Sequence, residues 1–356
     1  MNNFQRIKFW KNRKVFITGH TGFKGSWLII FLNIFKSKIT GLSLKPKKFS
    51  FFNQANCSKY LEKNYYSNIN DLKNLKKYIS ISKPEIIFHL AAQPLVSEAC
   101  KNPIKTLKTN IIGTANILEA VKDSKTVKVI VIITTDKVYK IKKKTTAFKE
   151  NDELGGVDPY SASKAASEII INSYIQTYFK KKNMKIKIAV ARSGNVLGGG
   201  DYSKNRIIPD ILKALNKNKE MIVRNPNHIR PWQHVIEPLF GYILLAENLY
   251  LNKINLGKEG YGWNFGPKNK SFTSVSELLM KFNKLKKFKK IKKIKSKLSE
   301  TKILKLNSKK SNKLLNWKQK WSIDDTIAKI FEWNKAFINK KNINEFSKNQ
   351  IKEYLS

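Results

Sequence analysis

Tyr160 and Lys164, in the segment YSASK, form the pair of residues with the most distinctive chemistry in the sequence. The segment opens a helical pattern that continues through SASKAASEIIINSYIQTYF, and residues four positions apart lie on one face of a helix. An ammonium group beside a phenol is expected to lower the tyrosine pKa from its reference value of about 10. Tyr160 would then accept a proton near neutral pH. The alternative is a surface pair with the same spacing and no catalytic role.

A second pattern is the glycine-rich segment GHTGFKG, which follows an apolar strand pattern at residues 15–17. Gly19, Gly22 and Gly25 recur every three residues ahead of an apolar helical pattern. Glycines at such positions let the backbone approach a pyrophosphate, and the free N–H groups and dipole of the helix start attract its charge. The strand before the loop and the helix after it are the context that a dinucleotide site requires.

The segment TTDKVY places polar residues where the apolar run VIVII ends. Thr134 and Thr135 would close a buried strand roughly 25 residues before Tyr160, and Asp136 and Lys137 follow them directly. The alternative for Asp136 is an N-cap or turn residue after the strand. Because this strand end accompanies the dinucleotide loop and the tyrosine–lysine pair, we interpret the three patterns as one active site.

The elements that must position these residues alternate between short strands and helices over the first 135 residues, as in parallel βαβ units. Strand patterns lie at 15–17, 38–42, 85–90, 129–134 and 186–190, and helical ones near 23–35, 71–81 and 105–123. After residue 192 glycines cluster in GNVLGGGD and the regular alternation stops. The sequence predicts an α/β fold, a Rossmann-like doubly wound parallel sheet with a smaller C-terminal α/β substrate domain. The expected dinucleotide-binding domain comprises 1–192 with about 233–262 returning to it, and the substrate domain 193–232 and 263–356.

The formal net charge of +45 comes from 70 Lys and Arg against 25 Asp and Glu. Such an excess is typical of proteins that bind nucleic acid or anionic membranes. Only six of the basic residues are arginine, however, and arginine is the side chain that pairs best with phosphate. We therefore expect no nucleic-acid partner, and interpret the lysine-rich stretch 281–306 as a solvated face over a buried seam. Four arginines fall within 39 residues, where an anion clamp could be assembled: Arg192, Arg206, Arg224 and Arg230.

The two cysteines, Cys57 and Cys100, have neither metal-ligand nor disulfide spacing, so we expect a reducing compartment and no metal site. No signal-peptide pattern precedes the first strand. The most apolar stretch, 27–35, is interrupted by Asn33 and is far shorter than the roughly 20 residues that span a bilayer. We therefore expect a cytoplasmic protein with no membrane partner.

The glycine loop, the threonines at the strand end and the YxxxK segment together resemble the extended short-chain dehydrogenase/reductase superfamily. The resemblance covers nearly the whole chain, including HLAAQ at 89–93, TNIIGTANILEA at 109–120 and ARSGNVLGGGD at 191–201. Several stretches resemble more specifically the CDP-glucose 4,6-dehydratase family. They are FWKNRKVFITGHTGFKGSWL, TTDKVY, NRIIPD, RPWQHVIEPLFGYILLAE and WNFGP.

The resemblance implies a lyase that uses NAD to convert CDP-glucose to CDP-4-keto-6-deoxyglucose and water. It implies that Tyr160, assisted by Lys164, takes the 4-hydroxyl proton, that Thr135 orients this hydroxyl and that Asp136 protonates the leaving 6-hydroxyl. Lys137 then stands where the base at C5 should be, which requires a neutral amine. If Lys137 stays charged, it would instead stabilise the developing enolate while another group such as Tyr160 removes the proton. A sugar-nucleotide 4-epimerase or reductase on the same scaffold is the alternative enzyme, and a basic nucleic-acid-binding protein the remote one.

The family pattern also implies the binding residues. Besides Tyr160 and Lys164, the expected cofactor-binding residues are Gly19, Thr21, Gly22, Phe23, Lys24, Gly25, Asp71, Leu90, Ala91, Ala92, Gln93 and Thr109. The expected substrate-binding residues are Gln93, Ser193, Asn195, Arg206 and Arg230. Lys24 either reaches phosphate or faces solvent, and Asp71 either contacts adenine or caps a helix.

The chain departs from a typical NAD site in the segment Ser43-Leu44-Lys45-Pro46, which lacks the acidic residue that binds the ribose 2′-hydroxyl. A lysine there would favour NADP, but the CDP-glucose family also lacks the acid and uses NAD, so we expect NAD. His228 and His234 are interpreted as structural histidines, and Arg224 as a surface ion pair. By analogy with the superfamily we expect a homodimer or homotetramer.

Overall fold

The computed structural model describes residues 1–141, 146–180, 186–268, 272–294 and 301–356. Its centre is a seven-stranded, entirely parallel sheet with strand order β11-β6-β5-β4-β1-β2-β3. The strands are β1 (Lys14–Thr18), β2 (Lys38–Ser43), β3 (Leu61–Tyr66), β4 (Ile86–His89), β5 (Val129–Ile133), β6 (Lys187–Ser193) and β11 (Gly262–Phe265). The predicted Rossmann-like sheet is confirmed. The sequence analysis did not single out β3, an edge strand whose sequence LEKNYY is mostly polar.

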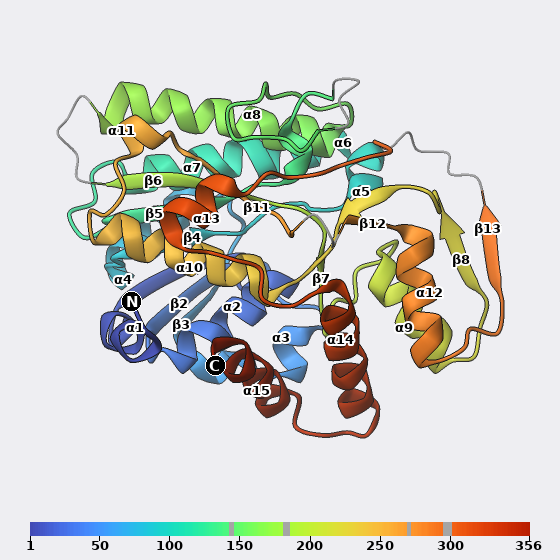
Figure 1. Ribbon diagram of the computed structural model, residues 1–356. Coiled ribbons are helices and arrows are strands. Elements are labelled where there is room, and N and C mark those ends of the chain that lie inside the picture. Colours follow the sequence, from blue (N-terminus) through green and yellow to red (C-terminus); the bar gives the residue numbers. More distant parts are fainter. Residues whose placement is uncertain (142–145, 181–185, 269–271, 295–300) are drawn as a thin grey trace.

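Helices cover both faces of this sheet, as Figure 1 shows. Alternate residues of a strand point to opposite faces, so Val129 and Val131 of β5 join one core while Ile130 and Ile132 join the other. The first core contains α2 (Phe23–Ile34) and α10 (Ile236–Tyr250), and the second contains α4 (Leu72–Ser82), α7 (Gly113–Val121) and α8 (Pro159–Tyr174). Since both faces are buried, β5 is apolar at every position.

The helix predicted near 105–123 is interrupted. It consists of α6 (Pro103–Leu107), a π-helical turn η2 (Lys108–Ile112) and α7. A second π turn, η4 (Ile175–Phe179), prolongs α8. The shorter elements of this part are α1 (Asn3–Trp10), α3 (Phe51–Gln54), η1 (Cys57–Tyr60), α5 (Val96–Lys101), η3 (Asp136–Val138) and α11 (Leu256–Glu259).

A smaller α/β unit lies to the right of the sheet in Figure 1 and surrounds its own core. It contains α9 (Ile207–Asn216), β8 (Met221–Arg224), β9 (Ile229–Pro231), β12 (Phe272–Ser274), α12 (Val275–Leu285) and β13 (Ile291–Ile294). Phe282 and Leu304 of the lysine-rich stretch are buried, but β13 is exposed at all four positions, so the expectation of a buried seam is wrong there. Residues 295–300 of that stretch lie outside the described residues.

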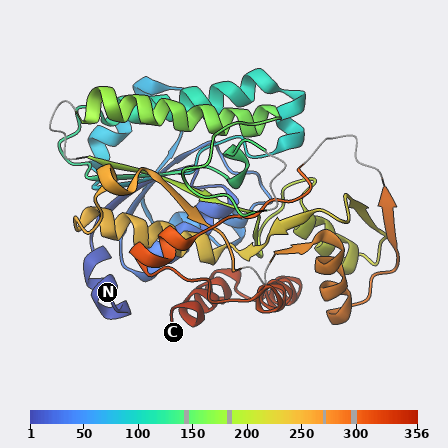
Figure 2. The same ribbon diagram turned by 45° about the horizontal axis from the view of Figure 1, so that its top comes forward.

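The C-terminal helices connect the two parts. α14 (Ile323–Ile338) joins the small unit's core, whereas α15 (Ile343–Leu355) packs against α2 of the sheet, below it in Figure 2. β7 (Val196–Leu197), β10 (Gln233–His234) and α13 (Lys309–Leu315) complete the elements. The domain boundaries at 192, 233, 262 and 263 stay a prediction. Within the described ranges, no helix combines the length and the apolar character that a membrane crossing requires.

Candidate active site

The candidate site lies at the carboxyl ends of β1, β4, β5 and β6, which are neighbours in the sheet. β1 leads into the glycine loop, β4 into HLAAQ and β5 into TTDKVY. Ligands of open α/β sheets bind beyond the carboxyl ends of the strands. The parallel arrangement thus explains why segments more than a hundred residues apart come together.

The glycine loop has the shape that a pyrophosphate requires. Gly19 has a φ of +73°, and a Cβ added there would lie 2.7 Å from the backbone nitrogen of Ala91. A Cβ on Gly25 would lie 2.4 Å from the carbonyl oxygen of Gly19. The helix α2 begins after Gly22, which provides no side-chain cap, so its first N–H groups are available to an anion. These residues fit a dinucleotide.

His20 and Thr21 of the glycine loop form hydrogen bonds with β2 and β3. The Thr21 hydroxyl lies 2.8 Å from that of Ser43. His20 is buried against Gly41, its Nε2 lies 2.8 Å from Asn64 Oδ1, and burial lowers its pKa. The sequence analysis missed His20, whose partner Asn64 is on the unrecognised β3. The Asp71 carboxylate accepts a hydrogen bond from the backbone N–H of Asn74 at 3.0 Å, so its predicted capping role is confirmed.

The Lys24 ammonium is buried against β6 and α10, so the alternative that it faces solvent is wrong. Its Nζ donates to the Ser193 hydroxyl at 2.8 Å and to the Tyr242 hydroxyl at 3.3 Å. Burial and the positive charges of Arg206 and Lys164, opposed by Asp136, together lower the Lys24 pKa to about 7. Tyr242 was not predicted, because it lies in the apolar helix α10 and looks like any core tyrosine.

Asp136 lies buried at the end of β5. Its Oδ1 accepts a hydrogen bond from the Thr135 hydroxyl at 3.0 Å, and its Oδ2 has no hydrogen-bond partner among the described residues. Burial raises the Asp136 pKa to about 6, although Lys137, Thr135, Arg230 and Lys24 all lower it. The proposed capping role of Asp136 is wrong, because Thr135 caps the short helix η3. The carboxyl group is therefore placed to donate a proton near neutral pH.

Tyr160 and Lys164 extend from the first turns of α8, whose N-cap is Asp158. Burial raises the Tyr160 pKa to about 12, and a hydrogen bond with Thr135 lowers it only in part. The expected lowering towards neutrality by Lys164 is therefore wrong for this state. The Lys164 Nζ instead donates to the carbonyl of Ile133 at 3.1 Å, and burial lowers its pKa to about 8 against the opposing effect of Glu168.

Lys137 and Arg230 line one hollow beside Asp136. Arg230 is buried on β9, where Nη1 donates to the carbonyl of Ile229 at 3.0 Å and Nη2 lies 3.0 Å from Nδ1 of His228. Lys137 is only partly buried, and its backbone N–H donates to Thr135 Oγ1 at 3.4 Å. Asp136 does not line this hollow, but the positive charges of Lys137 and Arg230 both lower the pKa of its carboxyl group.

The other predicted residues lie around this centre. Arg206 occupies the N-cap position of α9 without a capping hydrogen bond from its side chain, and its Nη1 lies 3.5 Å from Asp201 Oδ2. Its charge acts on both Lys24 and Tyr160. Gln93 follows β4 and donates through Nε2 to the Thr106 hydroxyl at 2.9 Å. The remaining predicted residues lie on the loop itself, after β4, on η2 and after β6: Phe23, Leu90, Ala91, Ala92, Thr109 and Asn195.

His234 was interpreted as a structural histidine and Arg224 as a surface ion pair. His234 is buried, its Nδ1 accepts from the backbone N–H of Ile236 at 3.3 Å, and its ring lies edge-on to Trp27 and Trp321. The Arg224 side chain is exposed, and its Nη1 donates a hydrogen bond to Asn205 Oδ1 at 3.4 Å. The structural interpretation of His234 is consistent with these contacts.

Comparison with known proteins identifies the family. The family model described as GDP-mannose 4,6 dehydratase matches residues 16–330. The chain is 38% identical to CDP-glucose 4,6-dehydratase of Salmonella typhimurium over 354 residues, which is 98% of each chain. Among solved structures, dTDP-glucose 4,6-dehydratase of Bacillus anthracis in complex with NAD has a TM-score of 0.77 at 21% identity, covering 92% of this chain and 98% of that one. UDP-glucose 4-epimerase of Thermotoga maritima with UDP-glucose has a TM-score of 0.78 at 20% identity, covering 91% and 99%. The chain therefore belongs to the GDP-mannose 4,6-dehydratase family of nucleotide-sugar dehydratases, as a homologue of CDP-glucose 4,6-dehydratase.

Proposed function

We propose that the protein converts CDP-glucose to CDP-4-keto-6-deoxyglucose and water with NAD as its cofactor. The observation that supports this most directly is the buried Asp136 between Thr135 and Lys137, beside Tyr160. An epimerase needs no acid for the loss of a hydroxyl group, whereas a dehydratase does. The full-length similarity to a CDP-glucose 4,6-dehydratase supports the same choice of reaction and nucleotide.

The loop residues Gly19, Gly22 and Gly25 would hold the pyrophosphate of NAD, with Thr21 near the ribose. Bound NAD supplies the hydride acceptor for C4 and returns the hydride to C6. The segment at 43–46 has no acid for the ribose 2′-hydroxyl, but NAD, rather than NADP, is the cofactor in the similar Bacillus anthracis structure.

Tyr160 takes the proton of the 4-hydroxyl as C4 is oxidised to the ketone. Thr135 orients this hydroxyl and also bonds the tyrosine, which offsets part of the cost of forming a buried phenolate. Lys164 lies one helical turn away, and its charge favours the deprotonated phenol during this step.

The elimination then uses the strand end. The C5–H bond breaks and its proton passes to Lys137, the C6–O bond breaks, and Asp136 protonates the departing hydroxyl, which leaves as water. The resulting enone takes back the hydride at C6 and a proton at C5. A charged Lys137 would instead stabilise the enolate, and another group would remove the C5 proton, for example Tyr160 after it has released the 4-hydroxyl proton to solvent.

Arg206, Arg230 and Asn195 are the residues that we assign to the substrate pyrophosphate, with Gln93 and Ser193 near the sugar. Arginine is suited to this role because its planar guanidinium binds phosphate oxygens in pairs. The keto product is an activated precursor of deoxysugars. We therefore place the enzyme in cytoplasmic deoxysugar and polysaccharide biosynthesis, O-antigen lipopolysaccharide included, as a homodimer or homotetramer.

The assay is incubation of the purified protein with NAD and, separately, CDP-, dTDP-, UDP- and GDP-glucose in heavy water. Mass spectrometry and NMR follow the products. Loss of water with one deuterium at C5, from CDP-glucose alone, is the expected result. Epimerised hexose without water loss would show that the 4-epimerase alternative is correct.

A variant of the enzyme tests the role of Lys137. Lys137→Met is expected to abolish exchange of the C5 hydrogen while NADH still forms, since C4 oxidation does not need this residue. Exchange at the wild-type rate would exclude Lys137 both as the base and as the group that stabilises the enolate.

A further inference from the structure

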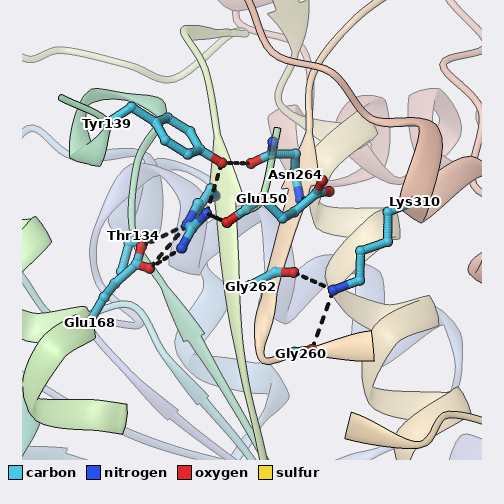
Figure 3. A network of polar contacts seen from close by, with 9 residues as sticks. Thr134, Tyr139, Glu150, Glu168, Gly260, Gly262, Asn264 and Lys310 are labelled. Carbon is cyan, nitrogen blue, oxygen red and sulfur yellow. Dashed lines mark hydrogen bonds and ion pairs between the residues drawn. The ribbon is translucent and has the colours of Figure 1, made fainter. Parts of the chain in front are cut away.

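A buried polar network lies directly behind the catalytic residues, and Figure 3 shows it. At its centre Glu168 of α8 forms an ion pair with Arg192 of β6, whose Nε is 3.0 Å from each carboxylate oxygen. Arg192 Nη1 donates to the Tyr139 hydroxyl at 2.8 Å, which in turn donates to Asn264 Oδ1 at 2.6 Å. The network therefore joins α8, β6, β11 and the segment that follows β5.

This network bonds the strand end that carries the catalytic residues. The Thr134 hydroxyl donates to Glu168 Oε1 at 2.6 Å, and the preceding carbonyl, that of Ile133, accepts from Lys164 at 3.1 Å. Lys164 and Glu168 are four residues apart and therefore lie on one face of α8. Two successive residues at the end of β5 are thus bonded to two successive turns of the helix that carries Tyr160.

The network also carries charge. Glu168 is the one neighbour that raises the Lys164 pKa, against the larger lowering by burial. Other titratable or charged groups near this lysine are Tyr160 one turn earlier on α8, Lys24 from α2 and His89 from β4. Arg192 faces Glu168 from β6. Lys164, Glu168 and Arg192 are all buried, so these charges act with little screening.

We propose that Glu168, held in place by Arg192, is a positioning residue for the dehydratase reaction. It fixes the end of β5 against α8, so that Thr135 and Asp136 face Tyr160, and it keeps Lys164 charged at physiological pH. The proposal rests on the proposed function, because the geometry that it protects is that of the assigned catalytic residues.

Two single variants separate the two effects. Glu168→Gln retains an oxygen for Thr134 but removes the charge, while Thr134→Val retains the charge but removes the hydrogen bond. The readout is the rate of C4 oxidation, followed as NADH formation, because this step does not need the Asp136 proton. For Glu168→Gln we expect the alkaline loss of this rate to move to lower pH by about one unit, with KM for CDP-glucose little changed. For Thr134→Val we expect kcat to fall about tenfold, because a small misplacement of reacting groups is costly. The pH at which activity is lost on the alkaline side should stay as in the wild type.

Glu168→Gln leaves Arg192 buried without its partner and could unfold the protein. The double variant Glu168→Gln/Arg192→Met removes both charges and gives the second test. An alkaline limb at the wild-type pH in either folded variant would overturn the charge role, and wild-type kcat in Thr134→Val would overturn the positioning role.

A measurement without substrate distinguishes this proposal from the proposed function. The Cε signals of lysine are followed by NMR against pH, with the Lys164 signal assigned by its loss in Lys164→Met. A titration of Lys164 that moves to lower pH in Glu168→Gln supports the electrostatic link even if wild-type protein dehydrates none of the four nucleotide sugars. An unmoved titration would contradict the link even in an active enzyme.

Discussion

Asp136, which we propose as the acid of the elimination, illustrates how a functional group can work against stability. The folded protein raises its pKa from 3.8 to about 6, chiefly through burial, so the folded state disfavours the carboxylate. Stability from this group is complete below about pH 4 and is lost as pH rises through 6. The same shift keeps part of the carboxyl protonated near neutral pH, where the elimination needs a proton donor.

Asp136→Asn should therefore be both more stable and less active. Asparagine stays neutral, so we expect the free energy of unfolding to rise by about 3 kcal/mol at pH 8 and by about half of that at pH 5. We expect kcat to fall at least about 100-fold while NADH still accumulates with CDP-glucose, because only the proton donor for the elimination is lost. Urea denaturation at the two pH values and the absorbance of NADH test this. An equal effect on stability at both pH values would show that the charge of Asp136 is not its cause.

Some residues of the candidate site can be predicted from short sequence motifs, and others cannot. The difference has a physical reason. Thr135, Asp136 and Tyr160 stand in short segments whose order along the chain is itself the signal. The contacts of Tyr242 and the direction of the Lys24 side chain follow instead from tertiary packing, which brings Lys24 of α2 against Ser193 and Tyr242, 169 and 218 positions away. No local pattern contains that information.

Among the helices and strands too, some could be predicted from local sequence patterns and others could not. β5 and α2 were predicted because they are buried almost throughout and so are apolar at nearly every position. β3 lies at the edge of the sheet, where polar side chains are tolerated, and its pattern does not separate it from a loop. The π turn η2 was likewise read as continuous helix, since a one-residue change in hydrogen bonding leaves the hydrophobic pattern nearly unchanged.

Among the elements, the loop between β1 and α2 allows a test with a matched control. A Cβ on Gly25 would lie 2.4 Å from the Gly19 carbonyl oxygen, so Gly25→Ala must displace the loop. We expect NAD binding, measured by titration of protein fluorescence, to weaken at least about tenfold, since the loss of even one charge-assisted hydrogen bond costs about 1.5–3 kcal/mol.

Gly257→Ala is the control, because among the described residues, outside its chain neighbours and its own helix backbone, its added Cβ would meet a single side-chain oxygen, Asn255 Oδ1 at 3.2 Å. It should bind NAD as the wild type does. If Gly25→Ala also binds NAD normally while remaining folded, the loop is not the pyrophosphate site.

At the scale of the whole molecule, the C-terminal segment is fastened to the start of α10. Glu237 accepts hydrogen bonds from the backbone N–H groups of Lys320 and Trp321 at 3.0 and 2.8 Å and from the Tyr354 hydroxyl at 2.7 Å. His234 lies one turn earlier, edge-on to Trp321. The tryptophans and the buried acid appear in the sequence as isolated residues, so this attachment could not be predicted from it.

Buried histidines then link the stability of the molecule to pH. Burial lowers the His234 pKa from 6.5 to about 3. Between about pH 3 and pH 6.5, His234 is therefore protonated in the unfolded chain but neutral in the folded chain. Stability is therefore lost as pH falls below 6.5, whereas the raised pKa values of Asp136 and Glu237 act in the opposite sense over much of the same range. His234→Asn keeps an oxygen near the Ile236 N–H but cannot be protonated. We expect its free energy of unfolding relative to the wild type to increase by about 2 kcal/mol from pH 7.5 to pH 5 in urea denaturation. A difference that does not change with pH would mean that His234 has the same pKa in the folded and in the unfolded protein.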